Sequence, residues 1–354
     1  MDSRLAPGLR IMSLDIARDS RTLEAAMRGD ERAFEDLIAP YRSELHAHCY
    51  RMLGSLHDAE DALQEGLLRS WRGLARFEGR SSLRSWLYRI ATNSCLRIIE
   101  RRQTRLLPTA YGPAADPQGP FGEPPAESTW IEPLPDVVAG IPDGRAGPEA
   151  RYEQRESVEL AFVAALQYLP ARQRAVLLLR DVLGFAPAEI AEALSTSPAA
   201  VSSALQRAHK AIGERLPERS QQATLRALGD ERLRRVVSSY ADAWECGDID
   251  AILDMLAQDA AFAMPPRAAW FRGREAIGAF LARAPFALGR RWRLVETSAG
   301  GQPAFGTYLW DGQRWAAHAI DVLTLSEDGR IDEVIAFIDA SVFGRFGLPD
   351  ELDA

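Results

Sequence analysis

Apolar residues recur at steps of three and four near the N-terminus, which places them on one face of an α-helix. The clearest run is Phe34, Leu37, Ile38, Tyr41 and Leu45. The pattern breaks at Gly54, and acidic residues then open a second predicted helix. "RFEGRSS" predicts a loop, with Ser81 or Ser82 as the N-cap of the next helix. Residues 20–102 are therefore expected to be helical.

The following stretch, residues 106–150, is rich in proline and glycine and has no helical period, which indicates a linker. Inside it lies the apolar island "STWIEPLPDV". The island fits a segment that docks on a folded domain, and it equally fits a disordered spacer.

Helical periodicity returns over residues 151–218, and a third unit begins near Gly229. That unit opens with helices and closes with alternating stretches joined by "DG" turns at Asp311 and Asp328. The pattern predicts an α+β domain with helices packed on a curved antiparallel sheet. The chain is thus expected to be multidomain, with two all-α domains before an α+β domain. The expected boundaries are 1–22 (tail), 23–105, 106–150 (linker), 151–218 and 229–348.

Charge is distributed unevenly along the chain of 354 residues, whose net charge is −8. Between Leu68 and Arg105 there are ten arginines and two acids, whereas residues 106–150 and 221–354 each carry a net charge of −6. Three widely spaced cysteines argue for reduced thiols and against a disulfide framework. No apolar run is long enough for a membrane span and no signal peptide opens the chain, so we expect a cytoplasmic protein with no membrane contact.

Metal or cofactor chemistry finds little support in the sequence. "HAHC" (residues 46–49) has two candidate zinc ligand types, but it has no second ligand pair, and periodicity buries part of it in a helix. Neither a glycine-rich phosphate loop nor a nucleophile elbow is present. We therefore expect no metal, no cofactor and no catalytic residue.

The stretch "PAEIAEALSTSPAAVSSALQRAHKAI" has the pattern of a helix-turn-helix. Ser197 suits the N-cap of the second helix and Pro198 its first position, although Ser195 stands where a glycine is usual. Small and polar side chains on the outer face would let this helix enter a major groove. An ordinary helical hairpin is the alternative. The outward residues are Ser197, Ala199, Ala200, Ser202, Ser203, Gln206, Arg207 and Lys210.

The helix expected over residues 83–101 carries two stripes. Leucine and isoleucine form a core stripe, while Arg89, Asn93, Arg97 and Arg101 recur at steps of four. Arginine and asparagine bind base edges and phosphates, and nearby Trp86 could stack on an unpaired base. The alternative is a core aromatic beside a solvated arginine face.

Both constellations occur in an order that resembles the extracytoplasmic-function (ECF) sigma factors of the sigma-70 family. The resemblance covers about residues 25–215, from "GSLHDAEDALQEGLLRSW" through "RSSLRSWLYRIATNSCLRIIERR" to the helix-turn-helix. It implies a protein that binds core RNA polymerase, directs it to promoter DNA and helps to open the duplex. A separate anti-sigma factor or a small-molecule ligand is left open as a further partner.

Carried over by position, the resemblance implies three functional surfaces. The helix-turn-helix residues above would read the −35 element. The −10 reader would comprise Phe77, Ser82, Arg84, Trp86, Arg89, Asn93 and Arg97. The polymerase-docking surface would comprise Asp58, Glu60, Asp61, Gln64 and Glu65.

The third unit resembles the SnoaL-like domains, a cone of helices over a curved sheet, as in sigma factors that carry such a C-terminal extension. We expect it to regulate the sigma domains in cis. Apolar residues such as Trp244 and Trp292 could line a pocket, and strand alternation places His318 and Asp321 on opposite faces. A ligand sensor and an enzyme remain alternatives for this domain. For the whole chain, the alternatives are a polymerase-independent DNA-binding regulator and an enzyme with a helical appendage.

Overall fold

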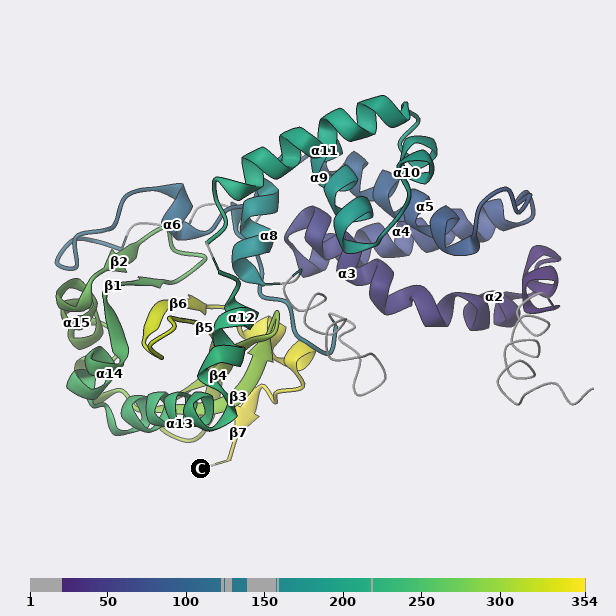
Figure 1. The fold of residues 1–354 in the computed structure, drawn as a ribbon. Helices are drawn as coiled ribbons and strands as arrows, with labels where there is room; N and C mark the ends of the chain where they lie inside the picture. Colours follow the sequence, from purple (N-terminus) through teal and green to yellow (C-terminus); the bar gives the residue numbers. More distant parts are fainter. Residues whose placement is uncertain are drawn as a thin grey trace, which may run out of the picture.

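The computed structural model describes residues 21–121, 124, 129–138, 157, 159–217 and 219–353 (Figure 1). Most of the predicted N-terminal tail and part of the predicted linker lie outside these residues. We name four parts: the N-terminal helical unit (residues 21–105), the strap (residues 129–138), the helix-turn-helix unit (residues 159–216) and the C-terminal domain (residues 229–353).

Local signals set the helix ends of the N-terminal helical unit. Gly54 ends α3 in the left-handed region at φ 67°, which favours glycine. The Ser55 hydroxyl accepts a hydrogen bond from the Asp58 amide and caps α4, and Ser82 rather than Ser81 caps α5. The helices are α2 (Glu31–Ile38), η1 (Ala39–Tyr41), α3 (Arg42–Leu53), α4 (Leu56–Leu74) and α5 (Leu83–Ile99).

The helix-turn-helix prediction is confirmed. Ser197 caps the second helix through the Ala200 amide, and Pro198 is its first residue. Ser195 adopts a φ of 51°, so it takes the left-handed turn conformation that glycine would adopt with less strain. The helices are α8 (Leu160–Gln167), α9 (Ala171–Leu177), η3 (Leu178–Val182), α10 (Pro187–Ala193) and α11 (Pro198–Gly213).

The C-terminal domain is an α+β cone, but its sheet is mixed. The strand order is β2-β1-β6-β5-β4-β3, with β7 paired to β5. The purely antiparallel prediction is wrong because β1 pairs with β6 in parallel. The helices are α12 (Gln221–Leu228), which connects to the domain, α13 (Asp230–Cys246), α14 (Ile249–Met255), α15 (Arg274–Arg283), η4 (Ala287–Gly289) and η5 (Ala340–Phe346). The strands are β1 (Leu256–Ala263), β2 (Trp270–Arg272), β3 (Trp292–Ala299), β4 (Gln302–Trp310), β5 (Trp315–Leu325), β6 (Ile331–Phe337) and β7 (Glu351–Leu352).

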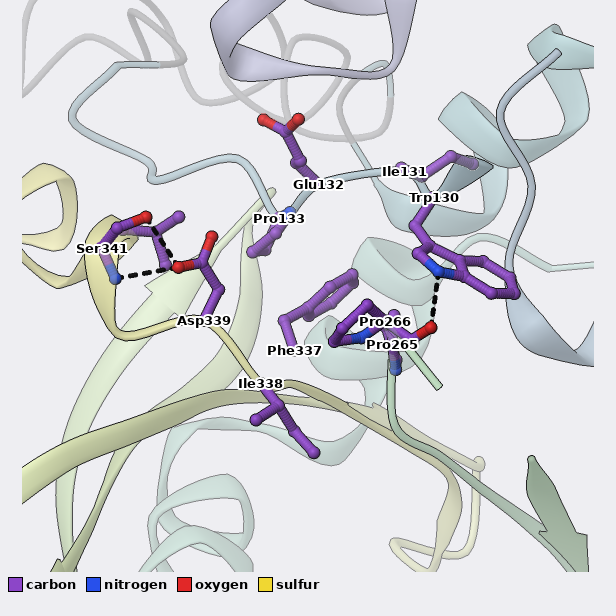
Figure 2. A pocket seen from close by; sticks show the side chains of 11 residues that line it. Trp130, Ile131, Glu132, Pro133, Pro265, Pro266, Phe337, Ile338, Asp339 and Ser341 are labelled. Carbon is purple, nitrogen blue, oxygen red and sulfur yellow. Dashed lines mark hydrogen bonds between the residues drawn. The ribbon is translucent and has the colours of Figure 1, made fainter. Parts of the chain in front are cut away.

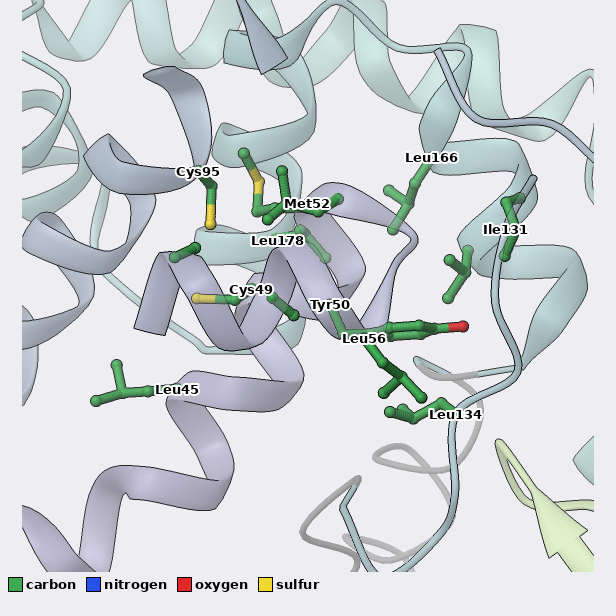
Figure 3. Close-up of a cluster of buried hydrophobic side chains, with 14 of the residues drawn as sticks. Leu45, Cys49, Tyr50, Met52, Leu56, Cys95, Ile131, Leu134, Leu166 and Leu178 are labelled. Carbon is green, nitrogen blue, oxygen red and sulfur yellow. The ribbon is translucent and has the colours of Figure 1, made fainter. Parts of the chain in front are cut away.

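Two buried clusters organise the chain. One fills the concave side of the sheet beneath α13, α14 and α15. The other runs without a break from the N-terminal helical unit through the helix-turn-helix unit and the strap to the convex side of the sheet. In Figure 3, Ile131 and Leu134 of the strap lie beside Tyr50 and Leu56, with Leu166 of α8 close by. The parts of the chain are therefore packed into one body by apolar contact.

The strap is the apolar island of the linker, and it docks rather than spans. Burial leaves Trp130 4% and Ile131 1% exposed. Trp130 Nε1 donates to the Pro266 carbonyl at 2.8 Å, beside a cleft of about 260 Å³ between the strap and the C-terminal domain (Figure 2). Further on, the Leu134 carbonyl accepts from the Gly300 amide at 2.7 Å. The strap thus joins the N-terminal helical unit to the convex side of the sheet.

Glu132 is the polar centre of the strap. Its carboxylate accepts hydrogen bonds from the Ser55 hydroxyl at 2.7 Å and from the Leu56 amide at 2.7 Å, at the first turn of α4. Arg105 lies 3.5 Å from the same carboxylate. An anion at a helix N-terminus satisfies amides that lack a helical partner and complements the helix dipole. A residue far along the chain therefore completes the start of α4.

Two more helices begin in the same way, each with an acceptor from another part of the chain. The Gln302 side chain of β4 accepts from the Leu160 amide at the start of α8, at 3.0 Å. The Glu159 carboxylate accepts from the Gln221 and Gln222 amides at the start of α12, at 3.1 and 2.6 Å. These caps tie the helix-turn-helix unit and the C-terminal domain to each other.

Removing the Glu132 carboxylate should loosen the strap. Glu132→Ala is expected to lower the free energy of unfolding by about 1–2 kcal/mol, the usual value of a helix cap with charge-assisted hydrogen bonds. Urea denaturation measures the change. Glu35→Ala, at an exposed position of α2, is the matched control and should change stability by less than about 0.5 kcal/mol. Equal effects of the two variants would contradict the capping role.

Candidate nucleic-acid interface

The outer face of α11 is open to solvent. All eight residues predicted to read the −35 element are exposed in this structure, whereas Val201, Ala208 and Ile212 are buried against the rest of the unit. The side chains near the start of the helix are small, and Arg207 and Lys210 follow further along it. A helix with this profile can enter a major groove and hold the flanking phosphates.

The predicted −10 face of α5 is covered by the helix-turn-helix unit. Arg84 donates to the Leu183 carbonyl at 3.3 Å, and its guanidinium lies 5.0 Å from the centre of the Phe185 ring. The same arginine lies 3.4 Å from Glu44 of α3. Its donors are therefore engaged within the protein.

Helix α10 supplies the acidic partners for the next turns of α5. The Ser85 hydroxyl donates to Glu189 at 2.9 Å, and Arg89 forms an ion pair with Glu192 at 3.6 Å. One turn later, the Asn93 amide reaches the Ala193 carbonyl at 3.5 Å. Neither Glu189 nor Glu192 was among the site residues predicted from the sequence. The Glu189 carboxylate also accepts a hydrogen bond from the Ala186 amide at the start of α10. From the sequence, this residue could therefore be predicted only as a helix cap.

The remaining predicted −10 residues differ in exposure: Trp86 is buried, Phe77 is half-buried, and the other two are exposed. Trp86 is 7% exposed and packs on Phe77, with ring centres 5.3 Å apart. In this structure Trp86 is therefore a core residue, which was the alternative to stacking on an unpaired base. Ser82 and Arg97 are exposed.

The contact between the two helical units contains buried cations. Arg174 of α9 is 3% exposed and donates to the Met52 carbonyl and to Gln167. Arg51 of α3 is 5% exposed and donates to the Ser157 carbonyl at 3.0 Å. Burial lowers the pKa of each guanidinium to about 10. Neutral carbonyl partners compensate a buried charge less fully than a carboxylate does, so this contact costs less to open than an apolar interface of equal size.

The predicted docking face on α4 is exposed except at one position. Glu60, Asp61, Gln64 and Glu65 are exposed, whereas Asp58 is 1% exposed. The Asp58 carboxylate pairs with Arg102 and, at 2.9 Å, with Arg105. Assigning Asp58 to the surface is therefore wrong for this structure, because two arginines beyond α5 hold it in the interior.

One exposed docking residue also meets the C-terminal domain. Arg345 of η5 lies 3.5 Å from Glu60, and both side chains are partly exposed to solvent. An exposed pair of this kind contributes little to stability. Its importance is positional, because it brings the C-terminal domain to the edge of the predicted docking face.

The concave side of the sheet holds a buried polar pair. Tyr240 of α13 donates to the Asp321 carboxylate at 3.3 Å, and burial raises the pKa of Asp321 to about 7. A bulge in β5 at His318 sets the His318 ring against Trp292, which also contacts Trp244. The alternation that separated His318 from Asp321 is therefore wrong, because the bulge brings both to one aromatic cluster.

Asp339, near the end of the C-terminal domain, caps η5 by accepting a hydrogen bond from the Ser341 amide at 2.9 Å. In "HAHC", His48 is buried and bonds Thr92 at 2.9 Å, and Cys49 is buried. Across the part of the chain that the structure describes, no group of three or more His, Cys, Asp or Glu side chains is placed to hold a metal ion. None of the described helices is long and apolar enough to cross a membrane.

Two helical units with an exposed recognition helix and an arginine-lined helix, followed by an α+β cone, define a DNA-reading transcription protein. Three family models match the chain: Sigma-70 region 2 over residues 37–105, Sigma-70 region 4 over residues 159–212 and a SnoaL-like domain over residues 237–334. The chain is 44% identical over 355 residues to the ECF RNA polymerase sigma factor SigG of Mycobacterium tuberculosis, covering 97% of this chain and 91% of SigG. The chain belongs to the ECF sigma factors and carries a C-terminal SnoaL-like domain.

Two other matches are partial in length or in identity. ECF sigma factor SigW of Bacillus subtilis is 35% identical over 83 residues, which cover 23% of this chain and 44% of SigW. The crystal structure of Mycobacterium tuberculosis SigJ superimposes with a TM-score of 0.54 at 22% identity, covering 88% of this chain and 98% of SigJ. At that identity the likeness to SigJ concerns the fold, and it confirms helical sigma domains followed by a SnoaL-like domain.

The burial of Asp58 separates it from its neighbours on α4. Asp58→Ala should lower the free energy of unfolding by about 3 kcal/mol or more, because it leaves two arginines without their buried partner. Asp61→Ala, at an exposed position of the same helix, should change it by less than about 0.5 kcal/mol. Chemical denaturation of both variants measures the difference. Two small and equal effects would show that Asp58 is not held in the interior.

The buried Asp321 carboxyl should make stability depend on pH. Its folded pKa of about 7 lies above the ordinary value of 3.8, so the folded chain holds a proton that the unfolded chain releases. This contribution is complete below the ordinary pKa and is lost as the pH rises toward 7. The free energy of unfolding should therefore fall less between pH 5 and pH 8 in Asp321→Asn than in the unchanged protein. An identical fall in both proteins would contradict the assignment. Burial also raises the pKa of Glu333 to about 7, but this contribution is the same in both proteins and does not affect the comparison.

Proposed function

We propose that this sigma factor uses the three surfaces predicted from its sequence. In this proposal the exposed face of α11 reads the −35 element. The α5 face with Arg84, Arg89 and Asn93 reads and helps to melt the −10 element, and the exposed acids of α4 dock on core RNA polymerase. The observation that carries the proposal is the combination of both sigma-70 regions in one chain with an exposed recognition helix. The same proposal places the protein in the cytoplasm, where promoter DNA is available.

We further propose that the arrangement in this structure is a closed state that must open before promoter binding. Glu189 of α10 accepts a hydrogen bond from the Ser85 hydroxyl, and Glu192 pairs with the Arg89 guanidinium. In the proposal, both groups would otherwise be free to bind DNA. The buried cations Arg51 and Arg174 favour a contact that can separate. Core polymerase would open the state by binding the separated units more tightly than the closed ones.

The SnoaL-like domain acts in this proposal as a regulator in cis, not as an enzyme. It reaches the N-terminal helical unit through the strap and reaches the helix-turn-helix unit through Gln302 and Glu159. Both units are therefore fastened to one scaffold, which limits how far apart they can move. Parts joined in one chain also gain from a high effective concentration, so weak contacts suffice.

Run-off transcription with and without core polymerase tests the function itself. The intact chain should give promoter-specific transcripts only with core polymerase, whereas a polymerase-independent regulator would bind duplex promoter DNA unaided. A chain that ends at Leu228 tests the regulatory part. If it matches the intact chain in promoter binding and transcription at every salt concentration, regulation in cis is wrong while the sigma function stands.

The closed state predicts a gain of binding when α10 loses its acids. Glu189→Gln with Glu192→Gln should strengthen binding of a single-stranded oligonucleotide by about threefold to tenfold, as expected for the loss of competing partly exposed ion pairs. Fluorescence anisotropy measures the affinity. Glu214→Gln with Glu35→Gln, two exposed positions away from α10, removes the same two charges and controls for the change in net charge. The gain should disappear when Arg89 is also replaced by alanine, and a gain that survives this replacement would contradict the mechanism.

A further inference from the structure

A cavity of about 290 Å³ lies where three parts of the chain meet, beside the proposed docking face, and the functions above assign it no ligand. Its walls come from the start of α3, from α4, from the end of the strap and from η5 of the C-terminal domain. The polar lining residues are Arg42, Ser43, His46, Glu60, Gln64 and Arg345. Leu56, Leu63 and Val138 supply the apolar part.

Positive charge in this cavity exceeds negative charge. Arg42 and Arg345 face a single carboxylate, Glu60. Arg345 lies 3.5 Å from Glu60, which is a long contact. The other guanidinium donors of Arg345 therefore stay available for a further partner. The Arg42 guanidinium, by contrast, has no hydrogen bond or ion pair with any residue that the structure describes. Two guanidinium forks beside one acid leave donors that match the geometry of a phosphate or carboxylate group.

His46 provides a second observation at the same place. Its Nδ1 atom is buried and, among the described residues, has no hydrogen-bond partner. Burial lowers the pKa of His46, Glu60 opposes the shift, and Arg345 and Arg42 add to it. The charges of both arginines therefore act on the imidazole across the cavity. A buried polar atom without a partner is uncommon in folded proteins and calls for a ligand or a rearrangement.

We propose that this cavity binds a small anion that carries a phosphate or carboxylate group, held by Arg42 of the N-terminal helical unit and Arg345 of the C-terminal domain. The bound anion bridges the two parts directly, where at present they share the Arg345–Glu60 contact. It replaces Glu60 as the partner of Arg345. On the proposed function, in which Glu60 belongs to the polymerase-docking face, the anion would stabilise the closed state.

The anion would also change the protonation of His46. A negative charge in the cavity offsets the effect of Arg42 and Arg345, so the pKa of His46 should rise on binding. The charged groups that face this ring are Arg42 on α3, Glu60 on α4 and Arg345 on η5. This signature distinguishes the cavity from an arginine elsewhere on the surface, because such a site would leave His46 unchanged.

The test is a titration of the full-length protein with inorganic phosphate and, separately, with succinate. Calorimetry reports the affinity, and the ring signals of His46, identified by their loss in His46→Gln, report its pKa by NMR. Arg42→Ala and Arg345→Ala should each weaken binding by about tenfold. Arg32→Ala, at an exposed position of α2, is the matched control and should leave binding unchanged. Preference for phosphate or for succinate identifies the anionic group.

Two results would overturn the proposal. Equal affinity in the three arginine variants, with no change in the His46 pKa, would mean an adventitious ion only. Absence of binding by either anion at concentrations up to ~10 mM, which corresponds to a very weak interaction, would mean that the cavity has no such ligand. Because neither readout uses transcription, the proposed function can fail or succeed independently.

Discussion

The contact between the Glu132 carboxylate and the first turn of α4 supports the arrangement of the whole chain. It gives the start of α4 an anion, and it fixes the strap on the N-terminal helical unit. From that point the strap runs to the convex side of the sheet, so the SnoaL-like domain is held close to α4. Since the domain also caps α8 through Gln302, both helical units are attached to it.

The distribution of polar groups explains how such a chain can be both compact and able to open. The strap contributes buried apolar side chains and satisfied hydrogen bonds, so its contacts are expected to persist when the helical units separate. Between the helical units, the apolar cluster is accompanied by arginines that meet exposed acids and neutral carbonyls. Exposed ion pairs contribute little and are screened by salt. The predicted −10 face is thus covered in part by ion pairs and hydrogen bonds that a polyanion such as DNA could replace.

Local features of this fold were predictable from the sequence, and contacts between distant residues were not. The Gly54 helix end, the Ser197 cap and the helix-turn-helix depend on neighbours within a few residues. The burial of Asp58 depends on Arg105, and the start of α4 depends on Glu132 of the strap, so an acidic first turn alone predicted an exposed face. The bulge at His318 and the parallel pairing of β1 with β6 likewise arise from sheet assembly. For the candidate site, the residue types were predictable from the motifs. That the helix-turn-helix unit covers the α5 residues was not predictable, because it depends on how the two helical units pack against each other.

The separation of the two helical units would show whether this structure is a closed state that opens on core polymerase. Spin labels at exposed Arg72 of α4 and at exposed Glu214, just after α11, would report it by pulsed electron resonance, with Cys246 replaced by serine. A closed state gives one narrow distribution of distances in the free protein, and opening on core polymerase shifts it to longer distances. A broad distribution in the free protein, or an unchanged distance on core polymerase, would contradict the closed state.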